Sequence, residues 1–142
     1  MNYSKLAKSY KSASVETASP GKLVLMLYDG ALRFMAAALA GFEEENFLRR
    51  NEQINNNLIR TQNILSELQN SIDMKVNGDL PQTLYSLYGH AYGLLQRANV
   101  NKDSAPIYEA QTIMQEIRDA WAEMLTKTEH GSKPMESICQ TA

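Results

Sequence analysis

The amino-acid sequence predicts an all-α protein, folded as an antiparallel up-down four-helix bundle. Apolar residues recur at steps of three and four along four long stretches, which is the spacing of one helix face. Helix-start signals and turn dipeptides separate these stretches. No segment alternates apolar and polar residues with the period of two that strands require. Short connections between long helices favour antiparallel neighbours.

The length of the chain suggests a single domain. A chain of 142 residues can bury enough surface to fold without a metal or a disulfide. We expect residues 19–130 to form the bundle. Residues 1–18 are expected to form an N-terminal cap segment that packs over one groove, and residues 131–142 a flexible C-terminal tail.

The first helix begins at a clear start signal. Ser19 is the expected N-cap, and Pro20 occupies the first helical position, where the missing N–H is harmless. The helix is expected to stop near Gly41. Its apolar seam follows steps of three and four and consists of Leu23, Leu27, Ala31, Phe34 and Ala38.

A second apolar stripe gives this helix more apolar surface than one seam needs. The stripe consists of Val24, Tyr28, Met35 and Leu39. Leu25 and Met26 belong to neither the seam nor the stripe. Two interpretations stay open. Either the neighbouring helices cover a wide core face, or the surplus lines a groove that receives another polypeptide.

The second helix is expected from about Glu44 to Ile72. Asn51 and Thr61 occupy seam positions where apolar residues are expected, and a buried polar group must find a partner. They either set the register of the helices, or they face a groove in which a bound chain supplies the missing bonds. The whole heptad seam comprises Phe47, Asn51, Ile54, Leu58, Thr61, Leu65, Leu68 and Ile72.

The third helix is expected to start near Asp79, with Pro81 in its first turn. Gly89 and Gly93 each cost up to about 1 kcal/mol in a helix interior. Either a neighbouring helix approaches closely there, or the two positions leave room for an entering peptide. The apolar residues of this helix are Leu84, Leu87, Tyr88, Ala91, Leu94, Leu95 and Ala98.

The fourth helix has Asp103 or Ser104 as its expected cap and is expected to end near Gly131. Its apolar residues recur at steps of three and four. They are Ile107, Ala110, Met114, Ile117, Trp121 and Met124.

Charge and cysteine content restrict the partners and the compartment. A formal net charge of −2 leaves no positive field for a phosphate backbone, which argues against nucleic acid as a partner. The single cysteine, Cys139, cannot form an internal disulfide. The N-terminus lacks the apolar core of a signal peptide, and the uncharged run after Lys22 meets Asp29 before it reaches the length of a membrane span. We therefore expect a cytoplasmic protein without membrane insertion.

The sequence lacks the patterns of common catalytic sites. A di-iron bundle requires Glu-x-x-His pairs, but Leu87 and Lys127 stand three residues before His90 and His130. The two histidines occur without a zinc-binding pattern, and no glycine-rich phosphate loop is present. We expect no enzyme activity, no cofactor and no metal, and we interpret His90 as a surface or hydrogen-bonded histidine.

Three stretches carry a resemblance to a known family. They are SVETASPGKLVLMLYDGALRF, TLYSLYGHAYGLLQRANVNKD and EIRDAW. In order and spacing they resemble the FliS flagellin-chaperone family, over about Tyr10 to Leu125. One departure is Gly89, where the family often has an acidic residue. The matching residues are Ser19-Pro20, Leu23, Leu27-Tyr28-Asp29-Gly30, Leu87-Tyr88, Leu94, Ala98-Asn99 and Ala120-Trp121.

The resemblance implies an export chaperone. Such a protein binds the disordered C-terminal segment of flagellin, prevents its premature polymerisation and delivers it to the flagellar export gate of the type III apparatus. Tyr10 matches a family tyrosine linked to client release or gate docking. In the free protein, Tyr3, Leu6 and Tyr10 would cover the apolar grooves. The implied partner-binding residues are Tyr10, Leu23, Leu27, Tyr28, Leu87, Tyr88 and Leu94.

A hypothesis from another class stays open beside the chaperone. The surplus apolar face could belong to a self-associating helical adaptor without a flagellin client, in which it forms a homodimer interface. The chaperone hypothesis expects the free form to be a monomer or a weak dimer.

Overall fold

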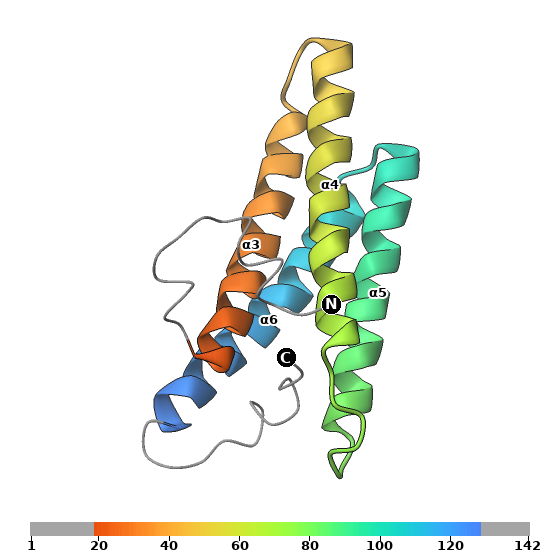
Figure 1. The fold of residues 1–142 in the computed structure, drawn as a ribbon. Coiled ribbons are helices and arrows are strands. Elements are labelled where there is room, and N and C mark those ends of the chain that lie inside the picture. The colour runs from red at the N-terminus through yellow and green to blue at the C-terminus, as the bar shows by residue number, and fades with distance from the viewer. Residues whose placement is uncertain (1–18, 129–142) are drawn as a thin grey trace.

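The structure, a computed structural model, describes residues 19–128, and these residues form four long helices (Figure 1). The helices are α3 (Pro20–Gly41), α4 (Phe47–Asn70), α5 (Leu80–Asn101) and α6 (Ala105–Thr128). No strand occurs within residues 19–128. The expected cap segment and tail lie outside this range, as do Tyr3, Leu6, Tyr10, His130 and Cys139.

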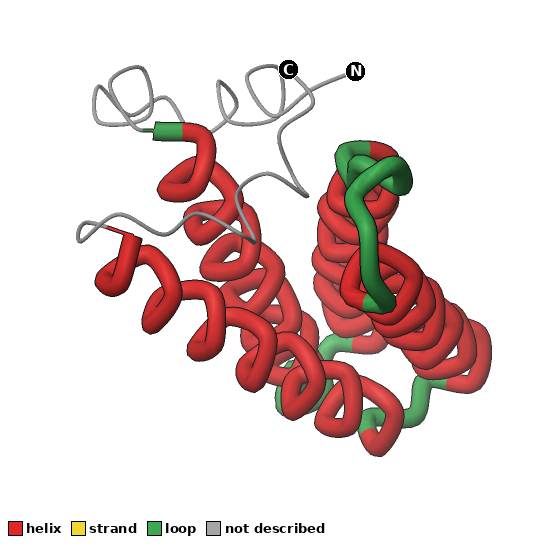
Figure 2. The backbone as a smooth tube through the Cα atoms, turned by 90° about the horizontal axis from the view of Figure 1, so that it is seen from below, coloured by secondary structure: helices red, strands yellow, loops and turns green. Residues whose placement is uncertain are grey.

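The four helices pack in a closed ring. α3 contacts α4, α4 contacts α5, α5 contacts α6, and α6 returns to contact α3. Successive helices run in opposite directions (Figure 1), which confirms the predicted antiparallel up-down four-helix bundle. The pair α3 and α6 diverges from the pair α4 and α5 toward the end that carries Pro20, Thr128 and the loop 71–79 (Figure 1 and Figure 2).

Local capping explains where the first two helices begin and end. Ser19 Oγ accepts a hydrogen bond from the Lys22 backbone N–H at 3.3 Å, and the helix ends at Gly41 as predicted. A Cβ on Gly41 would lie 3.1 Å from Ile54 Cγ1, so glycine permits the close approach of α4. α4 begins later than the predicted Glu44, because the Asn46 side chain caps it by accepting from the Arg49 N–H at 3.0 Å.

The third and fourth helices begin close to the predicted positions. α5 starts at Leu80 with Pro81 in its first turn. It ends at Asn101, and the following residue, Lys102, has a left-handed φ of 50° and an ammonium group that donates to the Asn99 carbonyl at 2.8 Å. Before α6, Asp103 Oδ1 accepts from the Ala105 N–H at 3.0 Å. The predicted end near Gly131 lies outside the described residues.

The core draws on both predicted stripes of α3. Leu23, Phe34 and Leu39 are half-buried at its margins. The reason is geometric, because α4 and α6 flank the helix and its most buried line runs between the two stripes. The fully buried apolar side chains of α3 are Val24, Leu27, Tyr28, Ala31, Met35 and Ala38.

A row of carboxamide hydrogen bonds fastens α4 to α5. The participating positions recur every seven residues on each helix, which keeps them on one face of an antiparallel pair. We call this row the amide ladder. Asn99 Nδ2 donates to Asn55 Oδ1 at 2.9 Å, Gln62 Nε2 donates to the Tyr92 carbonyl at 3.4 Å and to Gln96 Oε1 at 3.1 Å, and Gln69 Nε2 donates to the Tyr85 carbonyl at 3.0 Å.

The prediction that Phe47 joins the α4 seam is wrong. Its side chain is 69% exposed, and the adjacent Leu48 is 72% exposed. The register of the amide ladder, continued by seven residues, places Leu48 opposite Pro106, beyond Asn101 where α5 ends. The first turns of α4 therefore extend past α5 (Figure 1), and no part of α5 covers their inner side.

The polar seam residue Thr61 is satisfied within its own helix. Its side chain is fully buried, and its hydroxyl donates to the Asn57 carbonyl at 2.9 Å. Such a bond to the carbonyl four residues earlier is common for threonine in helices. The Thr61 hydroxyl thus has a partner that belongs neither to a neighbouring helix nor to a bound chain. Asn51, the other polar seam residue, is half-buried.

Two adjacent residues of α4 test this packing. Leu58 is fully buried, whereas Ile59 is 43% exposed. We expect Leu58→Ala to lower the free energy of unfolding by about 2–5 kcal/mol, because it leaves a cavity in the core. We expect Ile59→Ala to lower it by less than about 1 kcal/mol. Urea denaturation followed by circular dichroism measures both, and equal losses would contradict the assigned core face.

Candidate functional site

The structure places the predicted partner-binding residues in two environments. Leu27, Tyr28, Tyr88 and Leu94 are at most 1% exposed and belong to the core. Leu23 and Leu87 are half-buried and pack against the margin of that core. Tyr10 lies outside the described residues. Partner binding by this set stays a prediction, and in this conformation only the two half-buried leucines offer surface to a partner.

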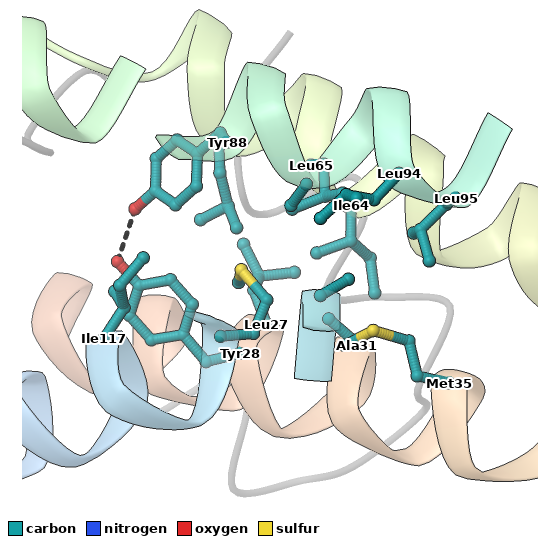
Figure 3. Close-up of a cluster of buried hydrophobic side chains, with 14 of the residues drawn as sticks. Leu27, Tyr28, Ala31, Met35, Ile64, Leu65, Tyr88, Leu94, Leu95 and Ile117 are labelled. Carbon is teal, nitrogen blue, oxygen red and sulfur yellow. Dashed lines mark hydrogen bonds between the residues drawn. The ribbon is translucent and has the colours of Figure 1, made fainter. Parts of the chain in front are cut away.

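The two buried tyrosines meet at their hydroxyl groups. Tyr28 of α3 and Tyr88 of α5 point toward one another across the core, and their oxygen atoms are 2.5 Å apart (Figure 3). The rings of Tyr28 and Trp121 are nearly perpendicular, with an angle of 82° between their planes and 6.0 Å between their centroids. The indole N–H of Trp121 donates to the Gly21 carbonyl at 2.8 Å. These aromatic residues therefore connect α3, α5 and α6.

α3 is the most apolar helix, and much of its surface is not buried. Within residues 19–128 it is the one helix long and apolar enough to cross a membrane, with a mean hydropathy of 1.6, and only 39% of that stretch is buried. A core helix passes the same test. Half-buried apolar side chains lie on both flanks of α3. They are Leu23, Met26 and Phe34 on one flank, and Leu25, Leu32 and Leu39 on the other.

An ion pair and a hollow lie between α3 and α6. Arg118 Nε donates to Asp29 Oδ1 at 2.8 Å, and this hydrogen bond is the main reason why the pKa of Arg118 is raised. The neighbouring hollow has a volume of about 470 Å³, with the half-buried Leu32 as its apolar wall. The remaining lining residues are Gln111, Thr112, Gln115 and Glu116 of α6. This hollow is polar on the α6 side.

The two glycines of α5 have different surroundings. A Cβ on Gly89 would lie 3.1 Å from Gln69 Nε2, so the predicted close approach of a neighbouring helix applies at this position. A Cβ on Gly93 would meet nothing within 4 Å. Helix packing among residues 19–128 therefore does not explain Gly93. A hollow of about 280 Å³ lies beside it, lined by Gly89, His90, Gly93, Leu94 and Arg97.

The sequence analysis missed the exposed apolar residues of α4 and α5. The signal was present in the sequence, since Tyr85 and Tyr92 are seven residues apart, as are Asn55, Gln62 and Gln69. The exposed large apolar side chains of these two helices are Phe47, Leu48, Ile59, Leu80, Tyr85, Tyr92 and Val100.

The described residues offer little to a metal or an acid–base reaction. No group of three or more His, Cys, Asp and Glu side chains within residues 19–128 is placed to hold a metal ion. His90 is exposed and lies 3.4 Å from Glu109 Oε2, as expected for a surface histidine. What the structure presents instead is apolar surface along α3, α4 and α5.

A double-mutant cycle tests the tyrosine contact. We expect Tyr28→Phe and Tyr88→Phe each to lower the free energy of unfolding by about 0.5–1.5 kcal/mol, because each removes one partner of a buried hydrogen bond. The free energy of unfolding of the double variant should fall by less than the sum of the two single losses. Urea denaturation of the three variants measures this coupling. Strictly additive losses would show that the two hydroxyls do not interact.

Comparison with known proteins gives consistent matches along the chain. The family model FliS, described as "Flagellar protein FliS", matches residues 2–128. The chain is 35% identical over 127 residues to the flagellar secretion chaperone FliS of Bacillus subtilis, covering 87% of this chain and 91% of that protein. It is 33% identical to the flagellar secretion chaperone FliS of Campylobacter jejuni, with 83% and 88% covered.

A more distant relative agrees with these two. The flagellar secretion chaperone FliS of Salmonella typhimurium is 28% identical, with 84% of this chain and 90% of that protein covered. The matches include all four helices and span most of each relative's length. On this basis, the chain belongs to the FliS family of flagellar proteins.

Proposed function

We propose that this chain is a cytoplasmic export chaperone that binds the disordered C-terminal segment of flagellin. By holding that segment it prevents premature polymerisation of flagellin, and it delivers the client to the flagellar export gate of the type III apparatus. The relatives are flagellar secretion chaperones. The structural observation that carries the proposal is the partly covered apolar surface of α3.

The physical demands of this function agree with a broad apolar surface. A disordered segment that folds on binding loses about 2–5 kcal/mol or more to ordering, and it typically buries 1,000–3,000 Å² to offset that loss. Burial of apolar surface supplies the offset at roughly 25 cal/mol per Å². A small polar pocket would not suffice. The half-buried leucines and Phe34 along both flanks of α3 offer a long apolar track instead.

The predicted partner-binding residues take two roles in this proposal. Leu23 and Leu87 are half-buried and can contact the client directly. The buried Tyr28 and Tyr88 hold α3 and α5 in position through their hydroxyl contact. Tyr10 remains a proposed contact for client release or for docking at the export gate. The free form is proposed to be a monomer or a weak dimer.

Mixing the purified chain with a peptide of the flagellin C-terminal segment tests the proposal. We expect binding in the micromolar range or tighter, together with a gain of helical circular dichroism beyond the sum of the separate spectra. The gain arises because the peptide orders as it buries its apolar side chains. An N-terminal flagellin peptide of equal length serves as the control. Absence of binding to the C-terminal peptide at micromolar concentration would overturn the proposed function.

Removal of residues 1–17 tests the proposed cap segment. We expect the shortened chain to unfold cooperatively and to bind the flagellin peptide more tightly than the full chain, because a competing cover lowers apparent affinity. Isothermal titration calorimetry and thermal unfolding provide the two measurements. Loss of the folded bundle, or weaker binding by a folded bundle, would contradict the cap.

A further inference from the structure

We infer that Asn77, in the loop between α4 and α5, is a site of spontaneous deamidation that turns its side-chain amide into a carboxylate. Asn77 and Gly78 form the one Asn-Gly pair of the sequence, and both residues are exposed. This modification is separate from the proposed function, because it depends on the chemistry of one turn and not on any partner.

The reaction is an attack by the backbone on the side chain that precedes it. The Gly78 nitrogen bonds to Cγ of Asn77, the bond from Cγ to Nδ2 breaks, and ammonia leaves with the proton that the Gly78 N–H gives up. The product is a five-membered succinimide ring. One water molecule then opens the ring at either carbonyl carbon, which gives aspartate or isoaspartate. Because both reacting groups belong to adjacent residues, the first step is intramolecular and therefore favoured.

The Gly78 nitrogen is available for this attack. Within residues 19–128, neither its N–H nor the Asn77 side chain forms a hydrogen bond. The neighbouring loop amides are engaged, since the Lys75 N–H donates to Asp73 Oδ1 at 2.9 Å and the Val76 N–H donates to the Asp73 carbonyl at 3.3 Å. An N–H held in a hydrogen bond gives up its proton less readily. The unbonded amide of Gly78 is therefore the more reactive one.

The local backbone leaves room for ring closure. Gly78 has a left-handed φ of 98°, and a Cβ at this position would meet nothing within 4 Å. The absence of a side chain keeps the nitrogen accessible and lets the turn rotate. The two residues lie between the half-buried Val76 and Leu80, the first residue of α5. The rotation that brings Cγ to the nitrogen therefore disturbs neither helix.

Asn70 shows that the fold contributes to the selection of Asn77. It also precedes a small residue, Ser71, but its backbone is held at the end of α4. The Ser71 N–H donates to the Glu67 carbonyl at 3.1 Å and to the Leu68 carbonyl at 3.3 Å, and Ser71 is only 1% exposed. Ring closure at Asn70 would first have to break these bonds.

Asp29 and Gly30 are a further pair that could form the same ring, with loss of water instead of ammonia. They lie in the interior of α3, where Gly30 is buried and its N–H is part of the helical hydrogen-bond pattern. The Asp29 carboxylate is held by Arg118, whose Nε lies 2.8 Å from Oδ1. Of these three pairs, only that of Asn77 combines an exposed side chain with an unbonded attacking amide.

The product keeps the bundle and changes its charge. Asn77 belongs to neither the core nor the amide ladder, so its conversion removes no packing contact. The new carboxylate makes the formal net charge one unit more negative than −2. It lies just before the N-terminus of α5, where a negative charge is favourable and where the Asp79 side chain forms no cap hydrogen bond. We expect Asn77→Asp to shift the melting temperature by less than about 4 °C.

Incubation of the full chain at mildly alkaline pH, followed by digestion and mass spectrometry, tests the site. The peptide that contains Asn77 should convert to a mixture of aspartate and isoaspartate, faster as the pH rises, because hydroxide removes the Gly78 proton. Asn70 should stay an amide. Asn77→Gln is the matched control, since it keeps the amide but must close a six-membered ring, and it should slow the conversion by about ten-fold or more. In the folded chain, conversion at Asn77 no faster than at Asn70 would overturn the proposal.

The same incubation in urea separates the contribution of the fold from that of the sequence. Unfolding releases the Ser71 N–H from its helical bonds, so the rate at Asn70 should rise. The amide that attacks Asn77 is already unbonded in the folded chain, so the ratio of the two rates should fall. An unchanged ratio would overturn the selection of Asn77 by the fold. None of these measurements needs flagellin, so their outcome is independent of the proposed function.

Discussion

Two tyrosine hydroxyls meet in the interior of the bundle, and the relative position of α3 and α5 depends on that contact. Tyr28 and Tyr88 are fully buried, and a buried polar group must be hydrogen-bonded to avoid a large desolvation cost. Their contact sets how far α3 lies from α5 across the core. Trp121 adds the same constraint for α6, because its indole N–H reaches the Gly21 carbonyl. The apolar residues around them then pack in one arrangement.

A bundle held in this way leaves apolar surface on its outside. The flanks of α3 are only half covered, since α4 and α6 each reach one side of a helix that is apolar around most of its circumference. At the outer edge of the α4–α5 interface, the two helices are joined by the hydrogen bonds of the amide ladder rather than by apolar contacts. Exposed rings and aliphatic side chains of α4 and α5 remain in contact with solvent.

Helix existence and helix starts could be predicted because they are local properties. Ser19 caps α3, which begins at Pro20, and Pro81 stands in the first turn of α5. The Asp103 carboxylate accepts a hydrogen bond from the backbone N–H of Ala105, the first residue of α6. Each depends on residues within one turn. The seam of α4 from Ile54 to Leu68 was also correct, since its periodicity is regular. For the candidate site, the family resemblance named the residues expected to bind a partner. Several of them, such as Leu27, are buried core residues.

The sequence by itself determined four amphipathic helices, their antiparallel order and an excess of apolar residues on the first, because periodicity and turn residues act over short distances. Only the tertiary structure decided which apolar residues stay exposed to solvent. Phe47 follows the seam pattern and is nevertheless exposed, since α5 ends before it reaches the first turns of α4. Gly93 looks like Gly89 in the sequence, but only one of them faces a neighbouring side chain. Burial depends on the relative lengths and register of helices that are distant in the sequence, and no local pattern contains that information.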